Sequence, residues 1–284
     1  MAHLAICIGA QKAGTSWLFR CLQEHPAICA TPGKELHFFS DRYDGTPSGL
    51  HSYEECFSTC ADRPIWFEAS TSYLSSEAVP ERIAKHYPDA RLIAILRDPV
   101  DRAFSHYLHL RSKEPQYTAT FLEALAEKPQ LVTNGKYGSH LARYRQHFDP
   151  QQILVIDYRD LERTPQAVID AVCTHLGIDS ITPSTLRKRY HSAEARSNRL
   201  YFKINKYLKK LRRTALGRSL LSGARRMGLS HVTFDTLMKK TGKKQAQLTA
   251  AERAEAATYF ADDQAAIRLI QAYFSSPGFS RSDG

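Results

Sequence analysis

The sequence lacks a long apolar run and contains little cysteine, methionine or tryptophan. Its 284 residues include six cysteines, three methionines and two tryptophans. No apolar stretch approaches the roughly 18–20 residues that a membrane-spanning helix needs. The short apolar run Leu4–Ile8 leads directly into a loop containing glycine, without the longer apolar stretch of a secretory leader. We therefore expect a globular protein located in the cytoplasm.

The cysteines are too scattered to form a recognisable metal site. They stand at positions 7, 21, 29, 56, 60 and 173. Cys56 and Cys60 have no matching Cys or His pair later in the chain, which argues against zinc. We expect reduced thiols, the ordinary state in the cytoplasm, and no metal.

Acidic residues are almost missing from one late segment. The whole chain has 39 Lys and Arg against 29 Asp and Glu, a formal net charge of +10. Residues 196–244 hold fifteen of the basic residues and a single acidic one, Asp235. We expect this segment to form a basic helical lid or subdomain. Apolar residues recur at helical spacing from Leu200 to Leu211, so peripheral contact with an anionic membrane, at its inner face, is the alternative. No nucleic-acid recognition module accompanies the charge.

Short apolar runs alternate with helical patterns along the first 177 residues. The predicted strands are Leu4–Ile8, Ile65–Glu68, Arg91–Leu96 and Ile153–Tyr158. The predicted helices are Thr15–Glu24, Val79–His86, Val100–Leu110, Tyr137–Phe148 and Pro165–Leu176. Apolar strands that alternate with helices predict a central parallel sheet covered by helices on both faces, a three-layer α/β fold of the P-loop type.

We expect one domain over residues 1–284. Its nucleotide-binding core spans 3–177, and a closing helix spans 249–274. This helix begins at a capping box formed by Thr249 and Glu252. The helical spacing predicts that it buries Phe260, Ile267 and Phe274.

A glycine-containing loop follows the first predicted strand and opens the first predicted helix. Its sequence is Gly9-Ala10-Gln11-Lys12-Ala13-Gly14-Thr15-Ser16. Backbone N–H groups in such a loop, together with the helix N-terminus, bind phosphate-like anions. Nucleotide triphosphatases place a lysine directly after the second glycine, whereas this chain has Thr15 there and its lysine at position 12. A lysine inside the loop can contact the bridging oxygen of a leaving group.

A second polar element follows the predicted strand Arg91–Leu96. Arg97 stands at the carboxyl end of that strand, where α/β folds bind ligands. Ser105 lies eight residues later, on the predicted helix Val100–Leu110. A guanidinium fork and a hydroxyl at this spacing are suited to one phosphate group.

Together the two stretches resemble the PAPS-dependent sulfotransferases. The resemblance lies in G-x-x-K-x-G-T-S after the first strand and R-x-P-x-x-R-A-x-S-x-Y after a middle strand. It implies that PAPS, 3′-phosphoadenosine 5′-phosphosulfate, is the co-substrate and that the 3′,5′-bisphosphate PAP is the product. By this resemblance the donor's 5′ end contacts the loop residues Gln11, Lys12, Ala13, Gly14, Thr15 and Ser16, and its 3′-phosphate contacts Arg97 and Ser105. Lys12 is then a catalytic residue.

The segment Lys34-Glu35-Leu36-His37-Phe38-Phe39 resembles K-E-x-H-F-F of the heparan sulfate branch, in which the glutamate is the catalytic base. Sulfuryl transfer requires the acceptor hydroxyl or amine to lose a proton, which a carboxylate or an imidazole can take. Glu35 is the first candidate for the base and His37 the second. A salt bridge from Glu35 to Lys34 or Lys12 is the structural alternative.

The segment Trp66–Tyr73 stands where this branch has E-K-[ST]-x-x-Y. The resemblance implies that Glu68, Ser70 and Tyr73 contact the acceptor. Ala69 departs from the pattern, because a lysine is expected at its position. The branch also tends to close its cofactor site with a disulfide-bounded loop, and this chain has no cysteine after Cys173. Another device must then cover the cofactor, and the candidates are Arg196, Asn198 and Arg199.

Two other functions remain open at this point. A P-loop kinase or ATPase using Mg-ATP is favoured by the apolar run that ends in Asp157, a pattern typical of a magnesium-holding strand. A non-catalytic module that binds anionic lipid is favoured by the basic segment 196–244. If the protein is a sulfotransferase, its acceptor is a glycan, a lipid or a small metabolite, and the oligomeric state is open.

Overall fold

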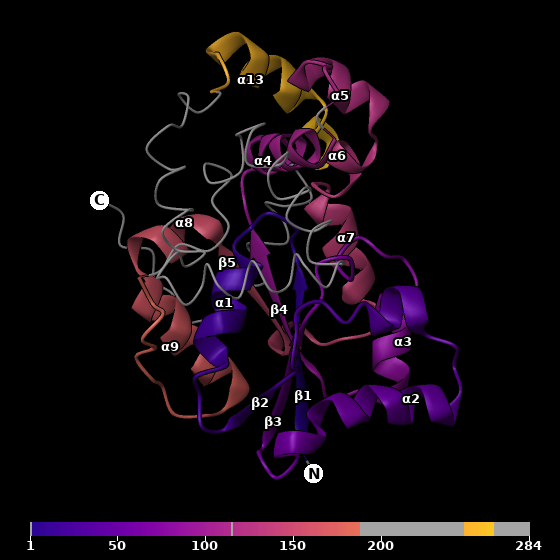
Figure 1. Ribbon diagram of the computed structural model, residues 1–284, viewed down its shortest axis with the longest axis vertical. Helices are drawn as coiled ribbons and strands as arrows, with labels where there is room; N and C mark the ends of the chain where they lie inside the picture. Colours follow the sequence, from indigo (N-terminus) through magenta and orange to yellow (C-terminus); the bar gives the residue numbers. More distant parts are fainter. Residues whose placement is uncertain (1, 115, 188–246, 264–284) are drawn as a thin grey trace, which may run out of the picture.

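A five-stranded parallel sheet forms the centre of the protein (Figure 1). The computed structural model describes residues 2–114, 116–187 and 247–263. The strands lie in the order β2-β3-β1-β4-β5, and their bounds are β1 (His3–Gly9), β2 (Ile28–Ala30), β3 (Ile65–Ala69), β4 (Arg91–Leu96) and β5 (Ile153–Asp157). Strands β1, β3 and β4 are almost entirely buried because most of their residues are apolar on both faces, and Glu68 of β3 is buried among them. The predicted parallel sheet is confirmed.

Helices cover both faces of the sheet. Figure 1 shows α1 and α9 on one side and α3 and α7 on the other, which confirms the predicted three layers. The helices are α1 (Thr15–Leu22), α2 (Pro47–Glu54), α3 (Val79–His86), α4 (Pro99–Lys113), α5 (Phe121–Glu127), α6 (Gln130–Thr133), α7 (Tyr137–Tyr144), α8 (Tyr158–Arg163), α9 (Pro165–Leu176) and α13 (Ala250–Thr258). Three short helical turns complete the described chain, η1 (Phe38–Arg42), η2 (Glu55–Cys60) and η3 (Pro150–Gln152).

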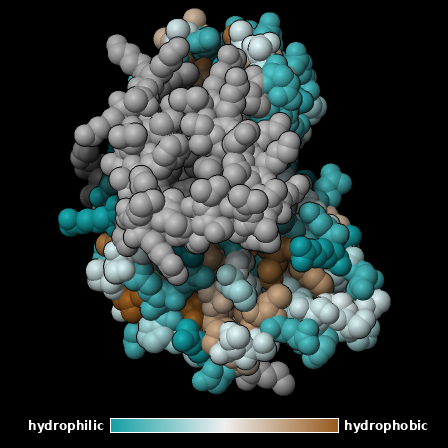
Figure 2. Space-filling model, in the orientation of Figure 1, coloured by the Kyte–Doolittle hydropathy of each residue, from teal (hydrophilic) through white to brown (hydrophobic). Residues whose placement is uncertain are grey.

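A second, smaller group of helices lies beyond the carboxyl ends of the strands. Helices α4, α5, α6 and α13 gather there (Figure 1) and share their own apolar core, which includes Phe121, Leu131 and Phe260. Figure 2 shows that hydrophilic residues cover α5 at the top of the molecule, whereas apolar side chains gather in the lower half of the same face. In open α/β folds the carboxyl edge of the sheet is where ligands bind.

The predicted elements agree with the structure in type and differ mainly at their ends. Helices α3 and α9 and strand β4 have the predicted bounds. Helix α7 ends earlier than predicted, at Tyr144, although Phe148 continues the buried apolar pattern beyond the helix. Tyr158 begins α8 instead of ending β5, because the Asp157 carboxylate accepts a hydrogen bond from the Arg159 N–H and caps that helix.

The start of the closing helix is confirmed. Thr249 and Glu252 form the predicted capping box at the beginning of α13. The helix ends at Thr258, and Phe260 is buried in the turn that follows. Ile267 and Phe274 lie outside the described residues. So do the basic segment 196–244 and, within it, the cap candidates Arg196, Asn198 and Arg199.

The expectation of reduced thiols is wrong for two of the six cysteines. Cys29 on β2 and Cys60 at the end of η2 form a disulfide, with their Cα atoms 5.4 Å apart. The sequence pattern missed this pair because β2 is only three residues long and η2 brings Cys60 back beside it.

Among the described helices, none has both the length and the apolar character needed to cross a bilayer.

Candidate functional site

The loop between β1 and α1 forms one wall of the site. Gly14 is the N-cap of α1 with φ +88°, and no side chain accepts a capping hydrogen bond there. The positive φ favours glycine here, and a Cβ at Gly14 would lie 2.6 Å from Cδ2 of Leu161, so the Leu161 side chain on α8 would have to shift. Within the described part of the chain, the buried Oε1 of Gln11 has no hydrogen-bond partner. This helix N-terminus suits an anion.

Arg97 connects this loop to α8. Its Nη1 donates a hydrogen bond to the carbonyl oxygen of Lys12 at 3.3 Å. Its guanidinium carbon lies 4.6 Å from the centre of the Tyr158 ring. Arg97 and Lys12, both predicted to bind the donor, are therefore connected by a hydrogen bond at the carboxyl edge of the sheet. Ser105 is partly buried on α4.

Arg102, the other arginine of the R-x-P-x-x-R element, has a structural position. It is fully buried, and its Nη2 donates to the carbonyl oxygen of Leu131, which ties α4 to α6.

Burial lowers the pKa of the nearby His106 to about 3, and the positive charges of Arg102 and Lys12 act in the same direction. His106 is therefore neutral at physiological pH.

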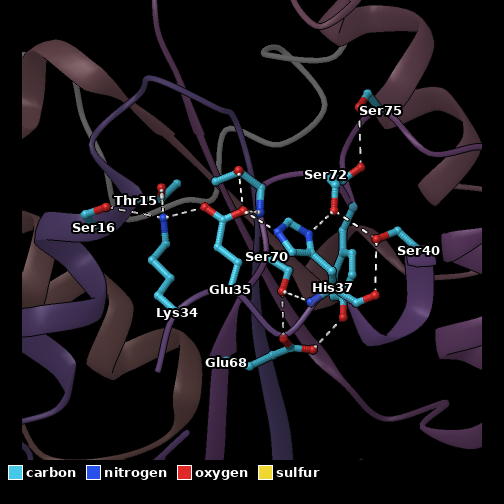
Figure 3. Close-up of polar contacts among 12 residues, drawn as sticks. Thr15, Ser16, Lys34, Glu35, His37, Ser40, Glu68, Ser70, Ser72 and Ser75 are labelled. Atoms are coloured by element: carbon cyan, nitrogen blue, oxygen red, sulfur yellow. Dashed lines mark hydrogen bonds and ion pairs between the residues drawn. The ribbon is translucent and has the colours of Figure 1, made fainter. Parts of the chain in front are cut away.

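The segment Lys34–His37 places a chain of polar groups beside the loop between β1 and α1 (Figure 3). Lys34 Nζ donates to Thr15 Oγ1 at 2.7 Å and lies 3.1 Å from Glu35 Oε1. Glu35 Oε2 accepts hydrogen bonds from the N–H and the hydroxyl of Thr71, at 3.1 and 2.8 Å. His37 Nε2 lies 3.4 Å from the same carboxylate oxygen. Both candidate bases thus lie in one network with the loop hydroxyls.

A buried carboxylate supports this network from below. Glu68 is inaccessible to solvent on β3 and accepts hydrogen bonds from the hydroxyls of Tyr53, Ser70 and Tyr73 at 2.9–3.0 Å. The Ser70 hydroxyl in turn accepts a hydrogen bond from the His37 N–H at 3.0 Å. Glu68 therefore holds the backbone of the segment that carries the candidate bases.

The pKa values of the two glutamates of the site are shifted in opposite directions. Burial alone would raise the pKa of Glu35, but the positive charge of Lys34 and the hydrogen bonds from Thr71 outweigh it and lower this pKa below its usual 4.5. Burial raises the pKa of Glu68 to about 7, although its hydrogen bonds act in the other direction. At neutral pH, Glu35 is an ionised carboxylate that can accept a proton.

The predicted site residues thus separate into two groups. The loop, Arg97, Glu35 and His37 lie at the carboxyl edge of the sheet. Glu68, Ser70 and Tyr73 are fully buried beneath Glu35 and His37, where their contacts support the segment. Their predicted contact with the acceptor stays a prediction, and their burial favours a supporting role. The salt bridge from Glu35 to Lys34, the structural alternative, is present.

Three residues of the network were missed as functional candidates. These are Lys34, Thr71 and Ser72, of which Ser72 lies 2.8 Å from His37 Nδ1 through its hydroxyl oxygen. Lys34 stands directly before Glu35 in the same motif, so the sequence places it next to the candidate base. Thr71 and Ser72 lie in the turn that follows β3, and only the fold places them beside Glu35 and His37. Asp157, which favoured the kinase interpretation, binds Arg159 at the start of α8.

Comparison with known proteins gives consistent matches over this core. The model of the family described as "Sulfotransferase family" matches residues 51–183. The crystal structure of a sulfotransferase from Alicyclobacillus acidocaldarius is 30% identical, with a TM-score of 0.58, over 68% of this chain and 89% of that chain.

Two human proteins match a similar share of the chain. Bifunctional heparan sulfate N-deacetylase/N-sulfotransferase 3 is 33% identical over 193 residues, which cover 61% of this chain and 22% of that protein. Heparan sulfate glucosamine 3-O-sulfotransferase 3B1 is 34% identical over 187 residues, covering 62% of this chain and 46% of that protein. The chain therefore spans less than half the length of either curated relative.

Proposed function

This chain belongs to the sulfotransferase family, and from that premise we propose that it transfers a sulfuryl group from PAPS to a hydroxyl or amine. The observation that carries the proposal is the direct connection between an anion-binding loop and an ionised carboxylate. Lys34 Nζ contacts both Thr15 of the loop and Glu35. A donor bound at the loop would thus present its sulfur near a group that can accept a proton.

The donor is proposed to bind along the carboxyl edge of the sheet. The loop N–H groups, Lys12, Thr15 and Ser16 would hold the 5′-phosphosulfate, and Arg97 and Ser105 the 3′-phosphate. Arg97 already contacts the loop through the Lys12 carbonyl, which supports a single continuous anion site. An arginine fork and helix N–H groups are the donors that phosphate oxygens prefer.

The proposed reaction is an in-line displacement at sulfur. The acceptor oxygen or nitrogen forms a bond to sulfur while the bond from sulfur to the bridging oxygen of PAPS breaks, which leaves PAP. Glu35 takes the acceptor proton, and its lowered pKa keeps it ionised for this task. Lys12 stabilises the negative charge that grows on the bridging oxygen. His37, 3.4 Å from Glu35, is the alternative base.

The acceptor is proposed to be a glycan, a lipid or a small metabolite. Relatives named for N-sulfation and for O-sulfation of heparan sulfate both match this chain, so we propose an amine or a hydroxyl without choosing between them. Contact of the basic segment 196–244 with an anionic membrane, and a cytoplasmic location, remain predictions.

Nucleotide binding by the Arg97→Ala variant tests the donor site. The variant should bind PAP more weakly by about 2–5 kcal/mol, because a half-buried charge partner of the 3′-phosphate is lost. Its affinity for adenosine 5′-monophosphate, which lacks that phosphate, should stay near the wild-type value. Both affinities are measured by isothermal titration calorimetry.

The control arm of this experiment separates donor recognition from support of the loop. Equal losses for the two nucleotides would mean that Arg97 serves only to hold the Lys12 carbonyl. Tight binding of Mg-ATP by the wild-type protein, with no binding of PAP, would support the kinase interpretation and contradict the proposed function.

A further inference from the structure

Lys34 lies between the two halves of the site, and the reaction as proposed above gives it no step of its own. Its ammonium group donates to Thr15 Oγ1 at 2.7 Å and to Ser16 Oγ at 3.4 Å, both on the first turn of α1. It also forms an ion pair with Glu35 at 3.1 Å. An ammonium has three N–H donors, and these three contacts can use all of them. Its side chain is only 14% exposed, so this charge is poorly screened by solvent.

The surroundings of Lys34 leave room for a ligand. A cavity of about 350 Å³ is lined by Ser16, Phe19, Arg20, Gly33, Lys34 and Glu35. Lys34 therefore borders an open space. In this cavity wall it connects the hydroxyls of the phosphate loop to the candidate base.

Resting on the proposed function, we propose that Lys34 is a bridging cation that serves both halves of the reaction. It orients the Glu35 carboxylate toward the cavity, and it adds positive charge at the Thr15 and Ser16 hydroxyls, where the anionic 5′ end of the donor binds. Lys34 is thus a positioning residue for the base and a contributor to the donor site.

Three other titratable groups lie near Glu35. His37 lies 3.4 Å from Glu35 Oε2. Glu68 lies beneath on β3, and the two carboxylates disfavour each other's ionisation. The Cys7 thiol on β1 is buried, and burial raises its pKa to about 12, so it stays neutral. Lys34 is the charge that most favours the ionised form of Glu35 among these neighbours.

The test uses Lys34→Met, which keeps the length of the side chain and removes its charge. Two quantities are measured on the full chain without any acceptor. The first is the pKa of the Glu35 carboxyl, from isotope-edited NMR of glutamate carboxyl carbons, with Glu35→Gln used to assign the signal. The second is the affinity for PAP, from calorimetry. Lys85→Met, the same change at an exposed position on α3, is the matched control.

The bridging role predicts that both quantities differ from their wild-type values in Lys34→Met. In the control Lys85→Met, both should match the wild-type values. The Glu35 pKa should rise by roughly one unit or more, because an opposite charge in contact lowers a carboxyl pKa by about that much. PAP affinity should fall roughly tenfold. Lys34→Arg, which restores the charge, should recover most of both effects.

A wild-type value for either quantity in a folded Lys34→Met protein would overturn the bridging role. Thermal melting checks the folding, and Lys34→Gln replaces the methionine variant if that variant does not fold. The proposed function fails separately, if the wild-type protein itself does not bind PAP.

Discussion

At the level of single residues, the proposed chemistry depends most on Glu35. Its carboxylate is fixed by two hydrogen bonds from Thr71 and by the ion pair with Lys34. Glu35→Gln keeps the shape and the ability to accept hydrogen bonds but cannot take a proton. We expect kcat to fall by roughly 10²–10⁴-fold, the usual contribution of a general base, with PAP affinity near wild type.

The comparison with His37→Ala identifies the base. If Glu35 is the base, His37→Ala should lower kcat less than Glu35→Gln does, because His37 contacts the acceptor's proton only through Glu35. Near-normal turnover of Glu35→Gln together with an inactive His37→Ala would instead assign the base to His37. Turnover of both variants is measured with PAPS and the same acceptor.

The buried Glu68 makes stability depend on pH in a direction opposite to most carboxylates. Its pKa is raised to about 7 in the folded protein, above the ordinary 4.5. The folded state therefore holds the proton more tightly than the unfolded state. The resulting stabilisation is complete below about pH 4.5 and is lost as the pH rises through 7.

Urea denaturation of wild type and Glu68→Gln at pH 5 and pH 8 measures this effect. The free energy of unfolding of wild type, relative to the variant, should fall by about 2–3 kcal/mol between the two pH values. Other titrating groups cancel in this difference. A relative stability that rises with pH would mean that Glu68 is ionised in the folded protein.

At the level of elements, α7 depends on a cap supplied from the far end of the described chain. The Asp263 carboxylate accepts hydrogen bonds from the N–H of Gly138 at 2.8 Å, and from the N–H and hydroxyl of Ser139 at 2.9 Å. Lys136, at the N-cap position, offers no side-chain cap. Helix α7 lies against the site through the Tyr144 hydroxyl, which donates to the Tyr73 carbonyl at 2.9 Å.

Asp263→Ala should therefore lower the free energy of unfolding by about 1–2 kcal/mol, at the upper end of the range for a lost cap. Asp263 is 3% exposed, so the freed N–H groups would stay poorly hydrated. Chemical denaturation measures the loss. The neighbouring exposed Asp262 gives the matched control Asp262→Ala, which should be neutral. Equal stability of the two variants would contradict the capping role.

The elements that sequence could predict are those with their own local signals. Pro165 and Gly177 mark the two ends of α9, and Thr249 with Glu252 marks the start of α13. Strand β2 was missed because three residues are too few to display a pattern. The hydrogen bonds from α7 to Asp263 and the pairing of Cys29 with Cys60 join residues far apart in the sequence, so no local sequence pattern predicts them.

As with the helices and strands, the sequence predicts those parts of the site that have a local pattern. The loop, Arg97 and Glu35 belong to motifs that can be recognised in the sequence. The burial of Glu68, Ser70 and Tyr73 was not visible, because a polar residue at the end of a strand can face either solvent or the core. The fold shows that Glu68 faces the core, where three hydroxyl groups donate hydrogen bonds to its carboxylate.

At the level of the whole molecule, the fold brings the predicted donor-binding residues and the candidate base to one edge of one sheet. The loop after β1, Arg97 after β4 and the segment around Glu35 all meet there because parallel strands point their carboxyl ends the same way. The smaller group of helices α4, α5, α6 and α13 lies over this edge (Figure 1). The active-site groups thus depend on the sheet for their positions.

The most direct test of the account is to follow sulfur from the donor. PAPS carrying a heavy sulfur isotope is incubated with the protein and a panel of glycan, lipid and small-metabolite acceptors, and the products are analysed by mass spectrometry. The isotope distinguishes a sulfuryl group from a phosphoryl group of nearly equal mass. We predict that one acceptor gains one labelled sulfuryl group and that PAP forms in equal amount. A parallel incubation contains Mg-ATP and the same panel. Phosphoryl transfer from Mg-ATP to an acceptor there, with all of the heavy sulfur left on PAPS in the first incubation, would contradict the account.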